Sequence, residues 1–251
     1  VLNPQTRAAG TGPLLLVIDG TWADARDWSR RIDRAGLLVE EAARQGRPVA
    51  VIRLTDAPGE TAFQAAAAWS ARLAGLTPQP WAPDAAAWAD ALPDGSFDTY
   101  WLSDGLAHPG RDALLAALER RGPVTVFESP RPILALRPAR FEDGVIRLTA
   151  LRLPAADAAE AEVSARGLDP SGVERELARL PVAFAAGAAE ATADLSLPPE
   201  LRNRISRFEL AGVRSAGAVT LTDDSLQRRK IALIAGAGGD GLGVGGRGQG
   251  L

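Results

Sequence analysis

The stretch Leu14-Leu15-Leu16-Val17-Ile18-Asp19-Gly20-Thr21 decides the fold of this 251-residue chain. Its first five residues are all apolar, without the alternation of a half-exposed strand. A short run of this kind predicts a strand buried on both faces, as in a parallel sheet. Residues 1–12 before it are polar and contain Pro4, Gly10 and Gly12, which predicts a linker.

Segments of the same kind alternate with helical patterns further along the chain. More strands are predicted at 49–54, 99–102 and 124–127, and helices at 24–45, 61–74, 84–92 and 111–121. Strands that alternate with helices imply right-handed crossovers and a parallel sheet covered on both faces. The predicted fold class is therefore α/β, with a Rossmann-like parallel sheet and helices on both faces over residues 13–140.

The apolar pattern changes to a period of two near residue 141. Val145–Leu153 is a predicted strand after the turn Asp143-Gly144, and short strands are predicted at 161–166, 178–184, 191–197, 206–210 and 218–221. Several short strands at this spacing predict an antiparallel β-sandwich domain over residues 141–228. All six tryptophans precede residue 140, which supports a boundary there. Residues 229–251 are predicted to be one last strand (229–235) and a disordered glycine-rich tail.

Composition excludes several classes of function. A net charge of −3 without a concentrated basic face argues against nucleic-acid binding. The chain has no cysteine, so disulfides, thiolate nucleophiles and cysteine-ligated metals are excluded. It also lacks an apolar run long enough to cross a bilayer. Because it has no methionine and begins at Val1, we expect a piece of a longer protein.

Two aspartates follow predicted strands at the edge where open parallel sheets bind ligands. Asp19 comes directly after the strand 14–18, and Asp104 lies in Ser103-Asp104-Gly105 after the strand 99–102. Carboxylate and hydroxyl oxygens on adjacent loops are the hard ligands that Mg²⁺ and Mn²⁺ prefer. The alternative is that both aspartates cap turns and helix starts.

These two motifs resemble the metal-ion-dependent adhesion site of the von Willebrand A family. That site uses D-x-S-x-S after the first strand, a threonine from a later loop, and an aspartate in a T/S-D-G turn. Asp19 and Thr21 match the first two ligands, and Ser103-Asp104-Gly105 matches the last turn. The resemblance implies a von Willebrand A-like domain that binds either no cofactor or a weakly held Mg²⁺ or Mn²⁺ at Asp19, Thr21 and Asp104.

The chain departs from the family pattern at other ligand positions. Ala23 stands where the motif has its final serine, and Trp22 lies between the matched positions. Thr77 is the only threonine near the expected third loop, and its proline-rich surroundings do not match. The predicted adhesion site is therefore degenerate.

A wider resemblance covers most of residues 1–235. Val1–Gln5, Leu14–Asp19, Ser103–Gly110 and Pro198–Ile205 resemble large alphaproteobacterial membrane proteins that begin with a BatA-like (aerotolerance regulator) pair of transmembrane helices. The resemblance implies a domain that faces the periplasm and is anchored in the membrane just upstream of Val1, with residues 1–12 as the linker from that anchor. It also implies protein partners, with a MoxR-type AAA+ ATPase system or Bat-like membrane proteins as candidates.

Three further motifs do not support dinucleotide binding, catalysis or nucleic-acid binding. Gly236–Gly241 spells G-x-G-x-x-G, but no helix or acidic residue follows at the distance that the dinucleotide motif requires. His108 is the only histidine and lies near Ser103, yet no G-x-S-x-G elbow supports a catalytic triad. Gln227–Lys230 is too short a basic run for nucleic acid.

The favoured function is a non-enzymatic protein-interaction module, with Trp22, Ser103 and His108 as candidate contacts to a partner. The alternative is a divalent-metal-dependent hydrolase using Asp19 and Asp104, helped by the nearby Asp24 and Asp27. A weaker alternative is a scaffold for a catalytic domain encoded downstream.

Overall fold

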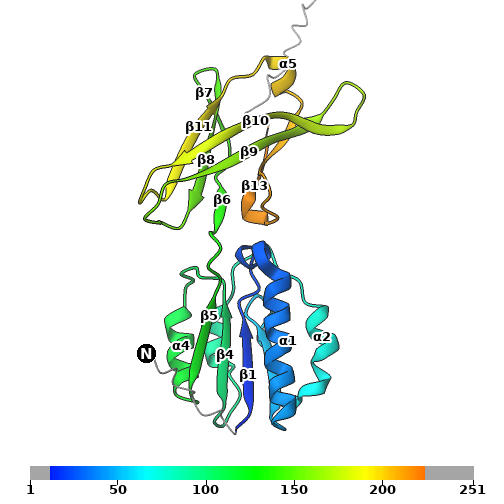
Figure 1. Cartoon of the computed structure of the whole chain (residues 1–251), viewed down its shortest axis with the longest axis vertical. Coiled ribbons are helices and arrows are strands. Elements are labelled where there is room, and N and C mark those ends of the chain that lie inside the picture. Colours follow the sequence, from blue (N-terminus) through cyan, green and yellow to red (C-terminus); the bar gives the residue numbers. More distant parts are fainter. Residues whose placement is uncertain (1–11, 224–251) are drawn as a thin grey trace, which may run out of the picture.

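The computed structural model describes residues 12–223, which form two lobes stacked end to end (Figure 1). The lower lobe holds a five-stranded sheet with helices, and the upper lobe holds antiparallel sheets. No helix in this part of the chain is long and apolar enough to span a membrane. Four predicted segments lie outside the described residues: residues 1–11 of the linker, the strand 229–235, the glycine-rich tail with Gly236–Gly241, and the basic run Gln227–Lys230.

The strands of the lower lobe form one sheet in the order β3-β2-β1-β4-β5. They are β1 (Leu14–Ile18), β2 (Pro48–Arg53), β3 (Gln64–Ala65), β4 (Asp98–Ser103) and β5 (Val124–Glu128). β1 pairs in parallel with both β2 and β4, and β4 pairs in parallel with β5. The two-residue strand β3 runs antiparallel to β2. The α/β class is confirmed, with a sheet that is mostly parallel and not wholly so.

Helices cover both faces of this sheet, as the unbroken apolar run of β1 requires. They are η1 (Trp22–Asp27), α1 (Trp28–Arg44), η2 (Ala66–Ala68), α2 (Ser70–Ala74), α3 (Ala85–Asp90) and α4 (Arg111–Glu119). Leu14, Leu16 and Ile18 pack with α1 and α2 on one face. Leu15 and Val17 pack with α3 and α4 on the other.

The predicted helix 61–74 is wrong over its first half. Gln64 and Ala65 extend the sheet by pairing with Val49 and Pro48, and α2 begins only at Ser70. Alanine favours a helix, but here the free edge of β2 supplies partners for the backbone of Gln64–Ala65, and tertiary context overrides propensity. The helix predicted from residue 24 likewise begins at Trp28, after the 3₁₀ turn η1.

Two antiparallel sheets form the upper lobe, in the orders β10-β9-β12-β13 and β11-β8-β6, with β7 also paired to β8. Its elements are β6 (Leu134–Leu136), β7 (Arg140–Glu142), β8 (Val145–Arg152), β9 (Ala159–Leu168), β10 (Glu174–Phe184), β11 (Glu190–Leu195), α5 (Pro199–Arg202), β12 (Ile205–Leu210), η3 (Ala216–Ala218) and β13 (Val219–Leu221). Both sheets contribute to one core, for example through Leu148, Val163 and Phe208. The antiparallel region begins at β6, ahead of the boundary predicted at residue 140.

The lobes meet where η1 of the lower lobe contacts η3 of the upper one. The Ser215 hydroxyl donates a hydrogen bond of 2.9 Å to the carbonyl of Trp22. Gly217 lies against the Trp22 ring so closely that a Cβ at that position would overlap the indole. The upper lobe therefore sits over the edge of the sheet at which β1, β4 and β5 end (Figure 1).

Candidate functional site

Asp19 and Asp104 lie side by side at the point where the strand order reverses. β1 has β2 on one side and β4 on the other, so the loops after β1 and β4 diverge at this point. The backbone N–H of Asp104 donates a 2.8 Å hydrogen bond to Oδ2 of Asp19. Only 1% of Asp19 and none of Asp104 is exposed. The folded chain thus brings together the two aspartates that the sequence singles out.

Both carboxylate oxygens of Asp19 have protein partners. Oδ1 accepts a 2.6 Å hydrogen bond from the indole N–H of Trp101, and Oδ2 lies 3.5 Å from Nη1 of Arg111. Burial, together with the negative charge of Asp104, raises the pKa of Asp19 to about 6 against the opposing effect of these donors. The Asp19 carboxylate therefore serves as a buried hydrogen-bond acceptor for groups of the protein itself.

The Asp104 carboxylate is saturated as well. Its Oδ2 accepts a 2.6 Å hydrogen bond from the Thr21 hydroxyl and lies 2.7 Å from Nε2 of His108. Its Oδ1 accepts a 2.8 Å bond from the Leu106 N–H. Burial acts to raise the pKa of Asp104, but the bonds from His108 and Thr21 hold it below the usual value. The same bond raises the pKa of His108, which favours a carboxylate–imidazolium pair.

A second buried cluster adjoins the first and contains Asp24, Asp27 and Arg31. Oδ2 of Asp24 accepts a 2.7 Å bond from the Gly20 N–H. Nε of Arg31 lies 2.9 Å from Asp24 Oδ1 and 3.0 Å from Asp27 Oδ1. Burial raises the pKa of Asp24 to about 7, despite the opposing charge of Arg31. Arg31 is not among the site residues predicted from the sequence, although its i,i+4 spacing from Asp27 is a signal for such a pair.

Arg111 supplies a positive charge beside the two aspartates. It lies at the start of α4, with Nη2 donating 2.9 Å to the Ser103 hydroxyl and the guanidinium 4.6 Å from the centre of the Trp101 ring. Stacking on an aromatic ring while donating in plane suits a guanidinium. Nothing in the local sequence pointed to this contact, because it depends on how α4 packs against β4.

The arrangement does not fit a divalent ion. Within residues 12–223 no three histidine, cysteine, aspartate or glutamate side chains form a group that could hold a metal. The Thr21 hydroxyl donates to Asp104, and Thr77 interacts with Arg53 and Gln79. A metal would have to displace the hydrogen-bond donors that already occupy the carboxylates. Weak binding of Mg²⁺ or Mn²⁺ stays a prediction that this geometry does not support.

Ser103, His108 and Asp104 do not assemble as a catalytic triad. Nε2 of His108 is bonded to Asp104, while the Ser103 hydroxyl contacts Arg111 and lies 3.3 Å from Oε1 of Glu128. In a Ser-His-Asp triad the histidine lies between the serine and the aspartate. Here His108 is bonded to Asp104 but not to Ser103, whose hydroxyl has Glu128 and Arg111 as partners.

The three predicted partner contacts lie in different settings. Ser103 has no exposed surface, Trp22 packs against Gly217 in the joint between the lobes, and the side chain of His108 is 10% exposed. Contact of these residues with another protein stays a prediction.

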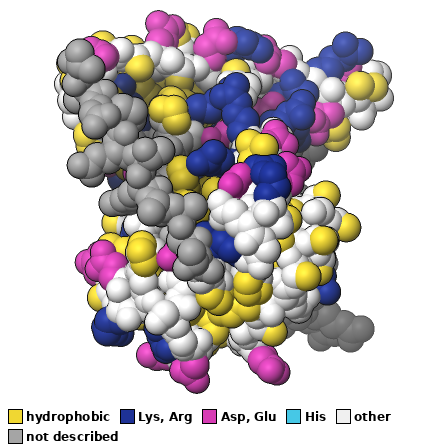
Figure 2. Space-filling view, turned by 60° about the horizontal axis from the view of Figure 1, so that its bottom comes forward, with side chains coloured by type: hydrophobic (Ala, Val, Ile, Leu, Met, Phe, Trp, Pro, Cys, Tyr) yellow, Lys and Arg dark blue, Asp and Glu magenta, His cyan; other side chains and the backbone are white. Residues whose placement is uncertain are grey.

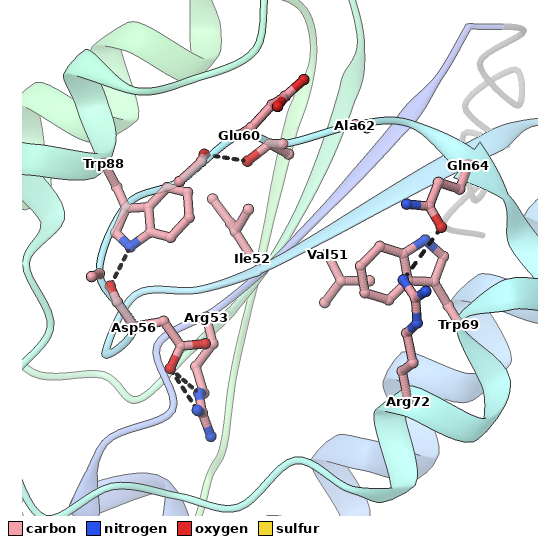
Figure 3. A pocket seen from close by; sticks show the side chains of 13 residues that line it. Val51, Ile52, Arg53, Asp56, Glu60, Ala62, Gln64, Trp69, Arg72 and Trp88 are labelled. Atoms are coloured by element: carbon pink, nitrogen blue, oxygen red, sulfur yellow. Dashed lines mark hydrogen bonds and ion pairs between the residues drawn. The ribbon is translucent and has the colours of Figure 1, made fainter.

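A pocket of about 330 Å³ lies beside β2 and β3. Trp69 and Trp88 stand on its two sides, and among its charged side chains Figure 3 draws interactions for Arg53, Asp56 and Arg72 but none for Glu60. Arg53 is bonded to Asp56, and Arg72 to Gln64. Asp19, Thr21 and Asp104 do not line it.

Comparisons with known proteins do not identify the chain: no family model matches it, and no curated protein or solved structure matches it significantly.

Proposed function

We propose that this chain is a non-enzymatic protein-interaction module. One observation carries the proposal: the carboxylates at the switch point are bonded to internal donors, and the loop beside them holds the second lobe. An active site needs a reactive group with an open position beside it. Asp19 and Asp104 instead have buried partners, which makes them structural anchors of the two loops.

The joint between the lobes supports a presenting role. Trp22 is the first residue of η1, directly after Asp19 and Thr21, and it contacts Ser215 and Gly217 of the upper lobe. The hydrogen bonds that hold this segment in place therefore also hold the surface on which the upper lobe packs. An interaction module gains from such rigidity, because surfaces held in place lose less entropy on binding.

The wider identity belongs to the same proposal. We infer a von Willebrand A-like domain with a degenerate adhesion site, carried by a membrane-anchored, periplasmic Bat-like protein. Its candidate partners are a MoxR-type AAA+ ATPase system or Bat-like membrane proteins. Support comes from the motifs around Asp19 and Asp104 and from the mostly parallel sheet in which they sit.

Affinity purification of the protein from its native membrane fraction tests the proposal. We expect a stoichiometric protein partner, and the absence of one would count against an interaction module. A phosphatase and esterase screen with added Mn²⁺ forms the second arm. Activity that is present in wild type and lost in Asp104→Ala would establish the hydrolase alternative instead.

A further inference from the structure

Strand β5 is an edge of the lower sheet and lacks the usual protection of edges. Within residues 12–223 it pairs only with β4. Thr99 N–H donates to the Pro123 carbonyl, so by alternation Val124, Val126 and Glu128 direct their N–H and C=O groups away from β4. An unpaired edge of this kind is a template for another strand.

Four other edge strands of the described residues are short or interrupted, whereas β11, with six residues, is a further edge that pairs only with β8. β3 has two residues, β6 and β13 have three each, and β10 carries Pro181 and an irregular register between Glu176 and Ala178. Short strands, proline and bulges are common ways of preventing edge pairing. β5 has five residues, without proline, glycine or lysine, and Val126 is 41% exposed. This edge is suited to accept a partner strand.

A groove of about 250 Å³ runs beside β5, between α1 and the segment that follows the strand. Leu102 and Phe127 are its apolar lining. Four arginines line it (Arg30, Arg31, Arg34 and Arg131), against two carboxylates (Asp27 and Glu128). Both carboxylates already face arginines, Asp27 through Arg31 and Glu128 through Arg111 at 3.4 Å. The groove therefore has an excess of positive charge.

The arginines retain donors for a ligand. Arg30 is exposed and has no carboxylate partner within residues 12–223. Arg34 places its guanidinium 4.5 Å from the centre of the Phe127 ring, with no acidic partner in the same range. Arg31 is only 6% exposed, yet its Nη2 has no acceptor among the described residues. Guanidinium groups at such a site favour carboxylates, which they bind through two parallel hydrogen bonds.

We propose that β5 and this arginine groove bind an extended acidic segment of a partner protein by strand addition. The inference rests on the proposed interaction function and names the class of partner. Because side chains alternate across a sheet, every second residue of the added strand lies on the face of Phe127 and α1, where acidic groups meet Arg30 and Arg34. The residues between lie on the face of Val126, where apolar groups fit. The recognised pattern is acidic residues alternating with β-branched ones.

Fluorescence anisotropy with a labelled peptide of alternating glutamate and valine tests this inference on the full chain. We expect saturable binding that weakens by about tenfold or more in Arg34→Glu, because charge reversal replaces attraction by repulsion. Arg120→Glu is the matched control, at an exposed arginine directly after α4 in the same lobe, and should change Kd by less than about twofold. Equal affinity of wild type and Arg34→Glu would overturn the inference.

Val126→Pro tests the strand-addition part. It removes an N–H that points away from β4, so the β4–β5 pairing keeps its bonds while the added strand loses one. We expect weaker peptide binding with an unchanged circular dichroism spectrum, and Val126→Lys provides a second variant if the proline unfolds the lobe. A peptide of the same composition in scrambled order should bind at least about fivefold more weakly. Equal binding of the scrambled peptide would mean charge attraction alone and would overturn strand addition.

Two further outcomes separate this inference from the proposed function. Peptide binding that appears only after deletion of residues 224–251 would assign the groove to this chain's own tail and overturn the inference. A native partner that copurifies equally with wild type and Arg34→Glu would also overturn it, yet leave the interaction module intact. Absence of any partner and of peptide binding would defeat both.

Discussion

Two arginine–carboxylate clusters, one in each lobe, lie in opposite environments. In the lower lobe Arg31 bridges Asp24 and Asp27 in the interior, with side-chain exposures of 6% or less. On the sandwich Arg207 holds Glu174 through two bonds of 2.7 Å, but 43% of that glutamate side chain is exposed. Figure 2 shows acidic and basic side chains interspersed over the upper lobe. Water already solvates the second kind of pair, so only the first should control stability.

Arg31→Met is the sharpest test of this difference. The substitution leaves Asp24 and Asp27 buried without their shared cation, and breaking a buried pair costs about 3–5 kcal/mol. Urea unfolding followed by tryptophan fluorescence measures the change. Arg30→Met on the same helical turn is exposed and should alter stability by less than about 0.5 kcal/mol. Similar losses for both variants would show that burial does not distinguish these arginines.

The buried cluster should also make the stability of the protein fall as pH rises. Burial raises the pKa of Asp24 to about 7, so between about pH 4 and 7 the folded state binds a proton that the unfolded state has released. From pH 5 to pH 8 the free energy of unfolding should therefore decrease, by about 2 kcal/mol for this group. The pKa of Asp19, raised to about 6, and the raised pKa of His108 act in the same direction.

Asp24→Asn isolates the contribution of one carboxyl, because asparagine resembles the protonated acid and does not titrate. The variant should match wild type near pH 5 and be the more stable of the two at pH 8. Urea titrations at the two pH values provide the measurement. Parallel pH profiles for both proteins would mean that Asp24 ionises in the folded state as easily as in the unfolded one.

A substitution at the contact between the two lobes tests whether this contact is rigid. Gly217→Ala places a methyl group inside the space of the Trp22 ring, and overpacking of this kind costs about 1–3 kcal/mol. The loss should appear in the lower lobe and the joint, with faster proteolysis of the connection near residues 129–133. Gly187→Ala is a matched control in solvent, since no atom lies near its added Cβ, although its φ of 73° adds some backbone strain. Equal protection of that connection in both variants would argue against a fixed joint.

The parts of this molecule that sequence predicts well are those whose signal is local. β1 is recognisable because every residue from Leu14 to Ile18 is apolar. The turn before β8 is recognisable because Asp-Gly is a common pair where two successive residues need positive φ, and Asp143 and Gly144 adopt φ values of 52° and 84°. β3 is not recognisable, since its two residues become a strand only through the free edge of β2. β6 follows Pro130 and Pro132 and is three residues long, too short for a visible alternation.

The candidate site divides in the same way. Asp19, Thr21 and Asp104 are predictable as neighbours, because strands of a parallel sheet end at a common edge. The sequence does not predict that hydrogen-bond donors already occupy the carboxylate oxygens. The Trp101 N–H and the Arg111 guanidinium reach Asp19 only through the packing between β1, β4 and α4. The sequence motif alone predicts a degenerate metal site, and only the tertiary contacts show that its carboxylates already have protein donors.

The smallest effect is expected on the sandwich. Arg207→Gln removes the bonds to Glu174 and Glu209, whose carboxylates then face solvent that already reached them in wild type. Exposed pairs gain little, because water screens the charges and two long side chains lose freedom to make the contact. The urea midpoint should therefore stay within error of wild type, and added salt should not separate the two proteins. A loss comparable to that of Arg31→Met would mean that the network of Arg207 with Glu174 and Glu209 acts cooperatively, and that exposure alone does not rank the ion pairs of this protein.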